Sequence, residues 1–335
     1  MKKILVILAV LALIAAAPLA AGGSQDSSGG AKARTYKLAD NQPDGYPTVL
    51  GDQKFADVVK EKTNGGIVIE VYNNSVLGNE KDTIEQTQIG DIHFIRVGTN
   101  PLSSVNPLGN ALSMPFLFRD RTHMFKVLDG PIGEEILQAY TSQNLLGLCW
   151  LDAGFRNFYN TKKEIKTPAD MKGLKIRVQE SSLMMDMVRN LGASPTPMAY
   201  GEVYPGMQNG IIDGAENNWP SYITAAHYEV AKYFTTDAHM CSPEMILINF
   251  ALWNSFTDAE KKLVKDAAIE GAKVERAEWL KAEKKYEQAA RDSGSIITNL
   301  SPEQHKLFQD AEAPLYAKPE YANLLPIIQR IRDTK

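Results

Sequence analysis

The stretch "IIDGAENNW" (residues 211–219) begins like a buried strand and then changes to polar and aromatic side chains. A carboxylate, two amides and an indole suit the lining of a wet pocket, because they offer hydrogen-bonding groups and one flat ring. The residues that supply them are Glu216, Asn217, Asn218 and Trp219. We expect this stretch to hold a molecule rich in hydroxyl or carboxylate groups.

Arg177, in "GLKIRV" (173–178), supplies the complementary charge. It points to the face opposite the apolar residues of its strand and stands close to the start of a helix at Ser181. A guanidinium binds a carboxylate through two parallel hydrogen bonds, and a helix N-terminus adds positive potential. The pattern therefore favours a carboxylate-binding site at Arg177. The alternative is a structural ion pair with Glu180, Glu202 or Glu216.

Motifs for catalysis are missing from the sequence, which has no GxSxG elbow, Walker loop, GxGxxG after a strand or HExxH. The five histidines have no metal-ligand spacing, and only His239 lies near a candidate pocket segment. Arg156, in "AGFRNFYN", is either a second cleft cation or a surface arginine stacked on its aromatic neighbours. We expect a binding protein, not an enzyme, without cofactor or metal.

The elements that must position these groups follow one plan twice. The first half predicts strands at 35–40, 67–72 and 91–97, with helices at 48–63 and 80–90. The second half predicts strands at 173–178 and 211–217, an extended segment at 194–199, and helices at 181–192 and 201–210. Each half calls for a parallel sheet with right-handed crossovers. Between them we expect loops, a helix near 121–142 and a strand at 145–154.

The last third of the chain predicts a connection between the two halves. Residues 243–253 read as a further buried strand, and a capping box from Thr257 to Glu260 begins a helix that continues to about 292. Such a helix is roughly 50 Å long at 1.5 Å per residue, too long for one lobe, so we expect it to span both. A last helix begins with a capping box of Ser301 and Gln304. The predicted fold is an α/β bilobal clamshell of the periplasmic-binding-protein type.

The predicted domain organisation places the ligand cleft between two lobes. It comprises a signal peptide at 1–22, a disordered leader at 23–33, lobe I at 34–152 plus 243–283, and lobe II at 153–242 plus 284–335. In open parallel sheets, ligands lie beyond the carboxyl ends of the strands. Those ends are 40–41, 73–80 and 96–99 in lobe I, and 177, 198–200 and 216–218 in lobe II.

The N-terminus predicts export. A basic "MKK", the apolar "ILVILAVLALIAAA" and a small-residue stretch are typical of a secretory signal peptide and too short for a membrane span. Gly22 stands where a lipoprotein would carry cysteine, so we expect no lipid anchor. Removal of Lys2 and Lys3 changes the net charge from −4 to −6, and an acidic surface argues against nucleic acid. An oxidising compartment permits a disulfide, but we expect Cys149 and Cys241 to be free and buried.

The segment 170–218, with "DMKGLKIRV" and "LGASPTPMAYGEVYPGMQNGIIDGAENN", resembles the solute-binding proteins of TRAP transporters (DctP type). The resemblance covers the mature chain, including "LGNEKDTIEQTQIGDI". It implies a periplasmic receptor that closes around an organic acid and then docks on membrane permease subunits driven by an ion gradient, with no ATPase. We expect the receptor to be a monomer.

The resemblance also implies roles for individual residues. The family's K-x-R-V arginine, which binds the substrate carboxylate, matches Arg177, and the asparagine that helps to orient this carboxylate matches Asn217. His239 falls at a polar position near the ligand network of some members. The other matches are a second cleft arginine at Arg156, an aromatic residue at Tyr200 and an acid at Glu80.

The chain departs from the sialic-acid branch, which carries E-N-P instead of "ENNW" and a cleft glutamate instead of Gly98. "FRNFYN" and "ENNWPSY" look more like members that bind hexuronates such as glucuronate or galacturonate. Asn218 and Trp219 suit a pyranose, with an amide for its hydroxyls and an indole for its ring face. The alternatives are a receptor for a C4-dicarboxylate or 2-oxo acid, an exported enzyme acting on sugar acids, and an ABC-type receptor.

Overall fold

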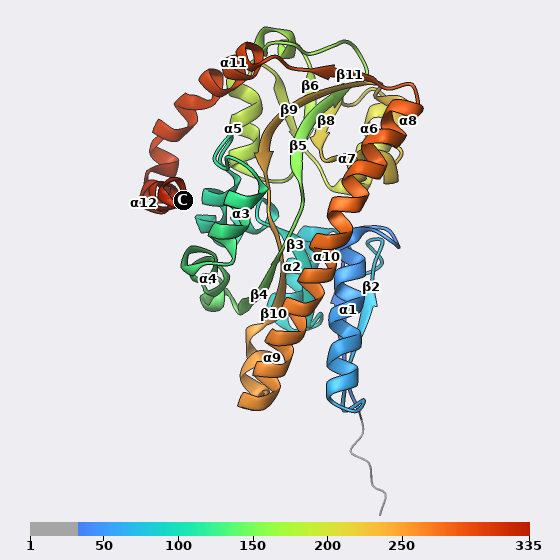
Figure 1. Cartoon of the computed structure of the whole chain (residues 1–335), viewed down its shortest axis with the longest axis vertical. Helices are drawn as coiled ribbons and strands as arrows, with labels where there is room; N and C mark the ends of the chain where they lie inside the picture. Colours follow the sequence, from blue (N-terminus) through green and yellow to red (C-terminus); the bar gives the residue numbers. More distant parts are fainter. Residues whose placement is uncertain (1–32) are drawn as a thin grey trace, which may run out of the picture. The chain divides into compact units, whose positions relative to one another are not determined.

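The computed structural model describes residues 33–335 (Figure 1). The predicted signal peptide, and the predicted leader up to residue 32, lie outside the described residues. Within the described part of the chain, no helix is long and apolar enough to cross a membrane. Two β-sheets organise this part, and we name them sheet A and sheet B.

Sheet A has five strands in the order β2-β1-β3-β10-β4. They are β1 (Arg34–Ala39), β2 (Ile67–Tyr72), β3 (Phe94–Gly98), β4 (Leu145–Leu151) and β10 (Glu244–Asn249). β1 pairs in parallel with β2 and β3, while β10 enters antiparallel between β3 and β4. Helices α1 (Pro47–Lys62) and α2 (Glu80–Ile89) connect the three parallel strands. The predicted β-α-β-α-β unit is therefore confirmed.

Sheet B has six strands in the order β11-β9-β5-β8-β6-β7. They are β5 (Phe155–Asn160), β6 (Lys175–Val178), β7 (Ser194–Pro197), β8 (Gly214–Asn217), β9 (Tyr233–Cys241) and β11 (Ile296–Asn299). β6 pairs in parallel with β7 and β8, as the repeated plan predicts. β5 lies antiparallel between β8 and β9, and sequence analysis assigned neither β5, β9 nor β11 to a strand.

The chain passes between the two sheets twice through short connections. It leaves sheet A after β4 and enters sheet B at β5, and it returns from β9 to β10. The helix α10 (Asp258–Asp292) forms the third connection, because it packs on α1 beside sheet A and on α7 (Trp219–Thr224) beside sheet B (Figure 1). A Cβ atom at Gly271 of α10 would lie 2.6 Å from the carbonyl oxygen of Gly51 in α1, so both helices approach closely there. The predicted two-lobed α/β fold with a long spanning helix is confirmed, and the lobe boundaries stay a prediction.

The remaining helices cover the sheets. They are α3 (Arg121–Leu128), α4 (Pro131–Gln138), α5 (Ser182–Asn190), α6 (Val203–Gln208), α8 (His227–Val230), α9 (Phe250–Ser255), α11 (Pro302–Glu312) and α12 (Leu325–Asp333). Both predicted capping boxes are present, at the start of α10 and of α11. Each satisfies backbone amides that the first helical turn leaves without partners.

Two predictions about these elements are wrong. The helix predicted near 121–142 is two helices, because Pro131 lacks an N–H and Gly130 before it leaves the helical conformation. The strand predicted at 243–253 ends at Asn249, whose side chain accepts a hydrogen bond from the backbone N–H of Leu252 at 2.8 Å and so begins α9. The last helix, α12, contacts α4 through an ion pair between Arg330 and Glu135 at 2.7 Å.

Candidate ligand-binding site

A polar cavity lies between the two sheets. Its lining residues are Asn41, Gln42, Glu80, Arg96 and Glu244 from the side of sheet A, and Arg156, Arg177, Gln179, Tyr200, Asn217, Asn218 and Ser221 from the side of sheet B. Several stand at the carboxyl ends of parallel strands, where open α/β sheets hold their ligands. Six of the eight predicted site residues line this cavity, and Trp219 and His239 do not.

Arg177, in β6, is the group in the cavity that is most suited to an anion. Its side chain is buried, and its Nε and Nη2 atoms both donate to the carbonyl oxygen of Met198, at 2.9 and 2.7 Å. Within residues 33–335 it forms no ion pair with the alternative partners Glu180, Glu202 and Glu216. Burial lowers the pKa of Arg177, the charge of Glu216 opposes this effect from a distance, and repulsion from Arg156 adds to it. A buried guanidinium without a carboxylate is costly unless an anionic ligand completes it.

Arg156, in β5, has its charge matched by the protein. Its Nη2 atom donates to Glu216 Oε1 and to the Glu216 carbonyl, each at 2.9 Å, and its Nε donates to Glu216 Oε2. Burial would raise the pKa of Glu216, but the guanidinium of Arg156 outweighs it and lowers this pKa to about 2. Arg156 is therefore not the surface arginine that one alternative described, and it borders the cavity as half of an ion pair.

His239 lies behind this ion pair rather than in the cavity. Its Nδ1 is 2.7 Å from Asp237 Oδ2, its Nε2 is 3.6 Å from Glu216 Oε2, and its ring stacks on Phe158. Burial would lower the pKa of His239, but the two carboxylates raise it to about 9. The imidazolium therefore stabilises Glu216 and acts on a ligand only through the Arg156 pair. His239 therefore lies near the cavity without lining it, and its contact with a ligand stays a prediction.

The stretch 216–219 divides between the cavity and the core. Asn217 Oδ1 accepts a hydrogen bond from the N–H of Asn218 at 2.9 Å, which turns its amide nitrogen into the available donor. Asn218 caps α7: its Oδ1 accepts from the N–H of Ser221 at 2.8 Å, and its Nδ2 donates to Ala153. Trp219 is the first residue of α7 and stacks on Phe234, with ring centroids 3.8 Å apart. The prediction that Trp219 covers a sugar ring is wrong for this structure.

Glu80 and Tyr200 border the cavity, as predicted. Glu80 is the first residue of α2, and its Oε1 accepts from the N–H of Gly98 at 3.1 Å and lies 3.4 Å from Arg96 Nη1. The hydroxyl of Tyr200 is buried and has no hydrogen-bond partner among the described residues. Both groups can therefore meet the hydroxyls of a ligand, Glu80 as an acceptor and Tyr200 as a donor or acceptor.

Sequence analysis missed Arg96 and Glu244 as site residues. Arg96 of β3 is almost fully buried and pairs with Asp40 and with Glu244, the latter at 3.1 Å. The signal for Arg96 was available, since the analysis placed it at a strand end in lobe I. No local pattern marks Glu244, because its position depends on β10 pairing with β3 across about 150 residues of sequence, where Glu244 stands opposite Gly98. The other lining residues that were missed are Asn41, Gln42, Gln179 and Ser221.

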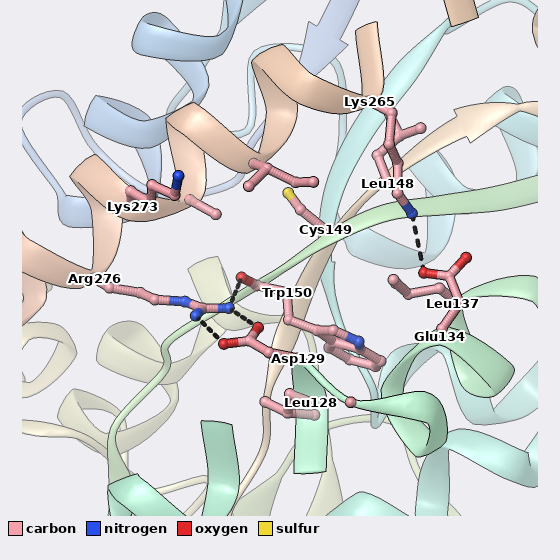
Figure 2. Close-up of a pocket in the computed structure, with 13 residues that line it drawn as sticks. Leu128, Asp129, Glu134, Leu137, Leu148, Cys149, Trp150, Lys265, Lys273 and Arg276 are labelled. Atoms are coloured by element: carbon pink, nitrogen blue, oxygen red, sulfur yellow. Dashed lines mark hydrogen bonds and ion pairs between the residues drawn. The ribbon is translucent and has the colours of Figure 1, made fainter. Parts of the chain in front are cut away.

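A second pocket lies against α10, β4 and the turn between α3 and α4 (Figure 2). Four of its five charged side chains form two ion pairs: Arg276 binds Asp129 at 2.7 Å, and Lys265 binds Glu134 at 3.3 Å, while Lys273 is exposed. Cys149 and Trp150 lie between these pairs. None of the predicted site residues reaches this pocket. It lacks the unpaired buried cation that distinguishes the polar cavity.

Cys149 and Cys241 are both buried and unbridged, as predicted. Among residues 33–335, no group of histidine, cysteine and carboxylate side chains is arranged to hold a metal ion. The polar cavity therefore depends on guanidinium, amide, hydroxyl and carboxyl groups alone.

A cavity of this chemistry between two α/β lobes defines a receptor for a small organic anion. The chain belongs to the DctP family, bacterial extracellular solute-binding protein family 7, whose model matches residues 38–322. Members of this family are periplasmic, bind small organic acids and work with TRAP permeases. The predicted family is therefore confirmed.

Close relatives agree with this assignment. A solute-binding protein of Chromohalobacter salexigens is 36% identical over 307 residues, which cover 91% of either chain. A solved TRAP periplasmic solute-binding protein of Xanthobacter autotrophicus Py2, with bound β-D-galacturonate, is 42% identical with a TM-score of 0.85, over 90% of this chain and 100% of that one. Another from Roseobacter denitrificans, with bound β-D-glucuronate, is 36% identical with a TM-score of 0.87 and the same coverage.

Proposed function

We propose that this protein is the periplasmic receptor of a TRAP transporter for a hexuronate such as galacturonate or glucuronate, which it delivers to the membrane permease. The observation that carries the proposal is Arg177, buried at the cavity with no carboxylate partner in residues 33–335. The relatives solved with galacturonate and glucuronate support the same ligand class. The receptor acts as a monomer, without an ATPase and without a catalytic step of its own.

In this proposal the ligand carboxylate binds Arg177, and the amide nitrogen of Asn217 donates a further hydrogen bond. Arg156 adds a further contact to the ligand, although Glu216 already neutralises its guanidinium. The sugar hydroxyls face the sheet A side of the cavity, where Glu80 accepts hydrogen bonds. The hydroxyl of Tyr200, which has no partner among the described residues, contacts the same hydroxyl-bearing part of the ligand.

A C4-dicarboxylate or 2-oxo acid is the second candidate ligand. It was suggested by the two cleft arginines, since each could bind one carboxylate. The ion pairs within the protein weaken this argument. Glu216 already neutralises Arg156. The other buried guanidinium of the cavity, that of Arg96, already pairs with Asp40, Glu80 and Glu244. A second ligand carboxylate would meet an acidic end of the cavity, which disfavours it.

A thermal-shift panel tests the ligand class directly. D-Galacturonate, D-glucuronate, succinate and pyruvate are each added to the mature protein, and the melting temperature is recorded. A ligand at a hundred times its dissociation constant adds about 2.7 kcal/mol to the free energy of unfolding. We expect this gain for a hexuronate, and a larger shift with succinate would overturn the proposal. Recovery of the uronate unchanged after incubation tests the absence of catalysis.

A further inference from the structure

Glu80 and Glu244 share one nitrogen of Arg96 at the acidic end of the cavity. Arg96 Nη1 lies 3.4 Å from Glu80 Oε1 and 3.1 Å from Glu244 Oε2. The other terminal nitrogen of Arg96 donates to Asp40 and Asn41. One guanidinium thus serves three carboxyl groups, and neighbouring carboxylates that share a site favour the retention of a proton.

The surroundings of Glu80 and Glu244 differ, and the difference indicates that Glu244 is the residue that retains the proton. Glu80 begins α2, where the helix N-terminus favours a negative charge, and it accepts a second hydrogen bond from the N–H of Gly98. Glu244 begins β10, and within the described residues only Arg96 donates to it. Its side chain borders the cavity, so its Oε1 remains available to a ligand.

The electrostatics of the neighbouring groups agree with this difference. Burial raises the pKa of Glu244, Arg96 lowers it, the charges of Glu80 and Asp40 raise it and Arg156 lowers it, and the balance of these effects is a pKa of about 7. The other titratable groups that interact with Glu244 are Tyr46, Asp52 and Glu275. Burial is the largest effect on each of these three groups, and it raises their pKa values.

We propose that Glu244 contacts the ligand as a neutral carboxylic acid, donating a hydrogen bond to a hydroxyl or ring oxygen of the sugar acid, while Glu80 acts as an acceptor. The inference rests on the proposed function, because it takes a sugar acid as the ligand. A bound sugar acid displaces water from Glu244 and brings a second negative charge into the cavity. Both effects favour the neutral form, so Glu244 takes up a proton from solvent when the ligand binds.

Isothermal titration calorimetry in buffers of different ionisation enthalpy measures this proton. At pH 7.5 we expect wild-type protein to take up a substantial fraction of one proton per D-galacturonate bound. Above pH 7 the affinity falls by up to about tenfold per pH unit, because ionised Glu244 must first be protonated. Glu244→Gln abolishes the proton uptake and this pH dependence, while the glutamine amide still donates a hydrogen bond to the ligand.

Glu80→Gln is the comparison variant: it alters the other carboxyl group on the same nitrogen of Arg96 and lowers the pKa of Glu244, because the charge of Glu80 raises that pKa. We expect it to keep the proton uptake. Wild-type protein that binds galacturonate without proton uptake, or a folded Glu244→Gln that retains the uptake, overturns the role of Glu244. Wild-type protein that melts normally yet binds neither galacturonate nor glucuronate between pH 6 and 8.5 overturns the proposed function instead.

Discussion

Arg156 and Glu216 form a buried, two-pronged ion pair in which Arg156 Nη2 donates to Glu216 Oε1 at 2.9 Å and Nε donates to Oε2. Glu216 is also the carboxylate whose charge acts most on Arg177, but its hydrogen bonds go to Arg156. The cavity consequently holds two guanidinium groups on the sheet B side but only one matched charge. A ligand carboxylate that binds there would neutralise the charge of Arg177.

Replacement of Arg177 by lysine keeps the charge but removes the planar fork. Charge-assisted hydrogen bonds contribute about 1.5–3 kcal/mol each, so loss of one or two weakens hexuronate binding by roughly ten- to a thousandfold. The fold survives, because Arg177 makes no ion pair in the described residues that the change would break. Calorimetric titration, beside an apo melting curve for each protein, measures both properties.

Arg189→Lys serves as the matched control for this variant, because Arg189 lies on the surface and pairs with Asp186 in the same lobe. It should bind the hexuronate like wild type. Near-wild-type affinity in a destabilised Arg177→Lys protein would contradict the assignment of Arg177 to the site.

Glu80→Gln distinguishes sugar acids from dicarboxylates. An ionised Glu80 accepts hydrogen bonds from sugar hydroxyls and repels a second carboxylate. The variant should weaken uronate binding by about ten- to a hundredfold and reduce dicarboxylate binding less. Titrations of each protein with D-galacturonate and with succinate give the two ratios. Tight binding of succinate by wild type would show that this end of the cavity is misassigned.

The parts of the site that the sequence predicted are those with local signals. Arg177 stands out because a charged residue alternates with apolar ones in a short strand, and the capping box at Thr257 predicted where α10 begins. The sequence prediction placed Trp219 in the cavity, because residue types alone do not show where the helix after Asn218 begins. Asn218 caps a helix that begins at Trp219, and this turns the indole toward Phe234 in the core.

The parts that could not be predicted depend on long-range pairing. Glu244 reaches the cavity because β10 enters sheet A antiparallel between β3 and β4, far from either in sequence. Phe234, the partner of Trp219, belongs to β9, whose position between β5 and β11 is likewise non-local. Register between distant strands is set by packing of the whole sheet, which a single window of sequence does not contain.

Ligand binding should close the two lobes. Glu80 and Arg177 lie on opposite sides of one cavity, and the side chains of Asn100 and Gln179 join the two sides through a hydrogen bond of 2.9 Å. One ligand that contacts both sides favours the closed state. Small-angle scattering should therefore show a smaller radius of gyration with saturating D-galacturonate. Arg177→Lys at the same ligand concentration is the control, and identical wild-type profiles with and without ligand would contradict closure.

Glu312, in α11, makes stability depend on pH independently of the ligand. It is almost fully buried, accepts one hydrogen bond from Asn190 at 3.3 Å, and has no donor to its Oε1 among the described residues. Burial raises the pKa of Glu312 from 4.5 to about 8. Between these values the folded state retains a proton that the unfolded state releases, so the free energy of unfolding falls as the pH rises and levels off above about pH 8.

Glu312→Gln removes this dependence, because glutamine is neutral in both states. The free energy of unfolding of the variant should equal that of wild type near pH 4.5 and exceed it by about 3 kcal/mol at pH 7. The difference should be larger at pH 8.5. Urea unfolding at pH 5, 7 and 8.5 measures the difference. Glu320→Gln, at an exposed position nearby, is the control and should show a small gap that does not grow with pH. A gap between Glu312→Gln and wild type that stays constant over this range would mean that Glu312 is ionised in the folded protein.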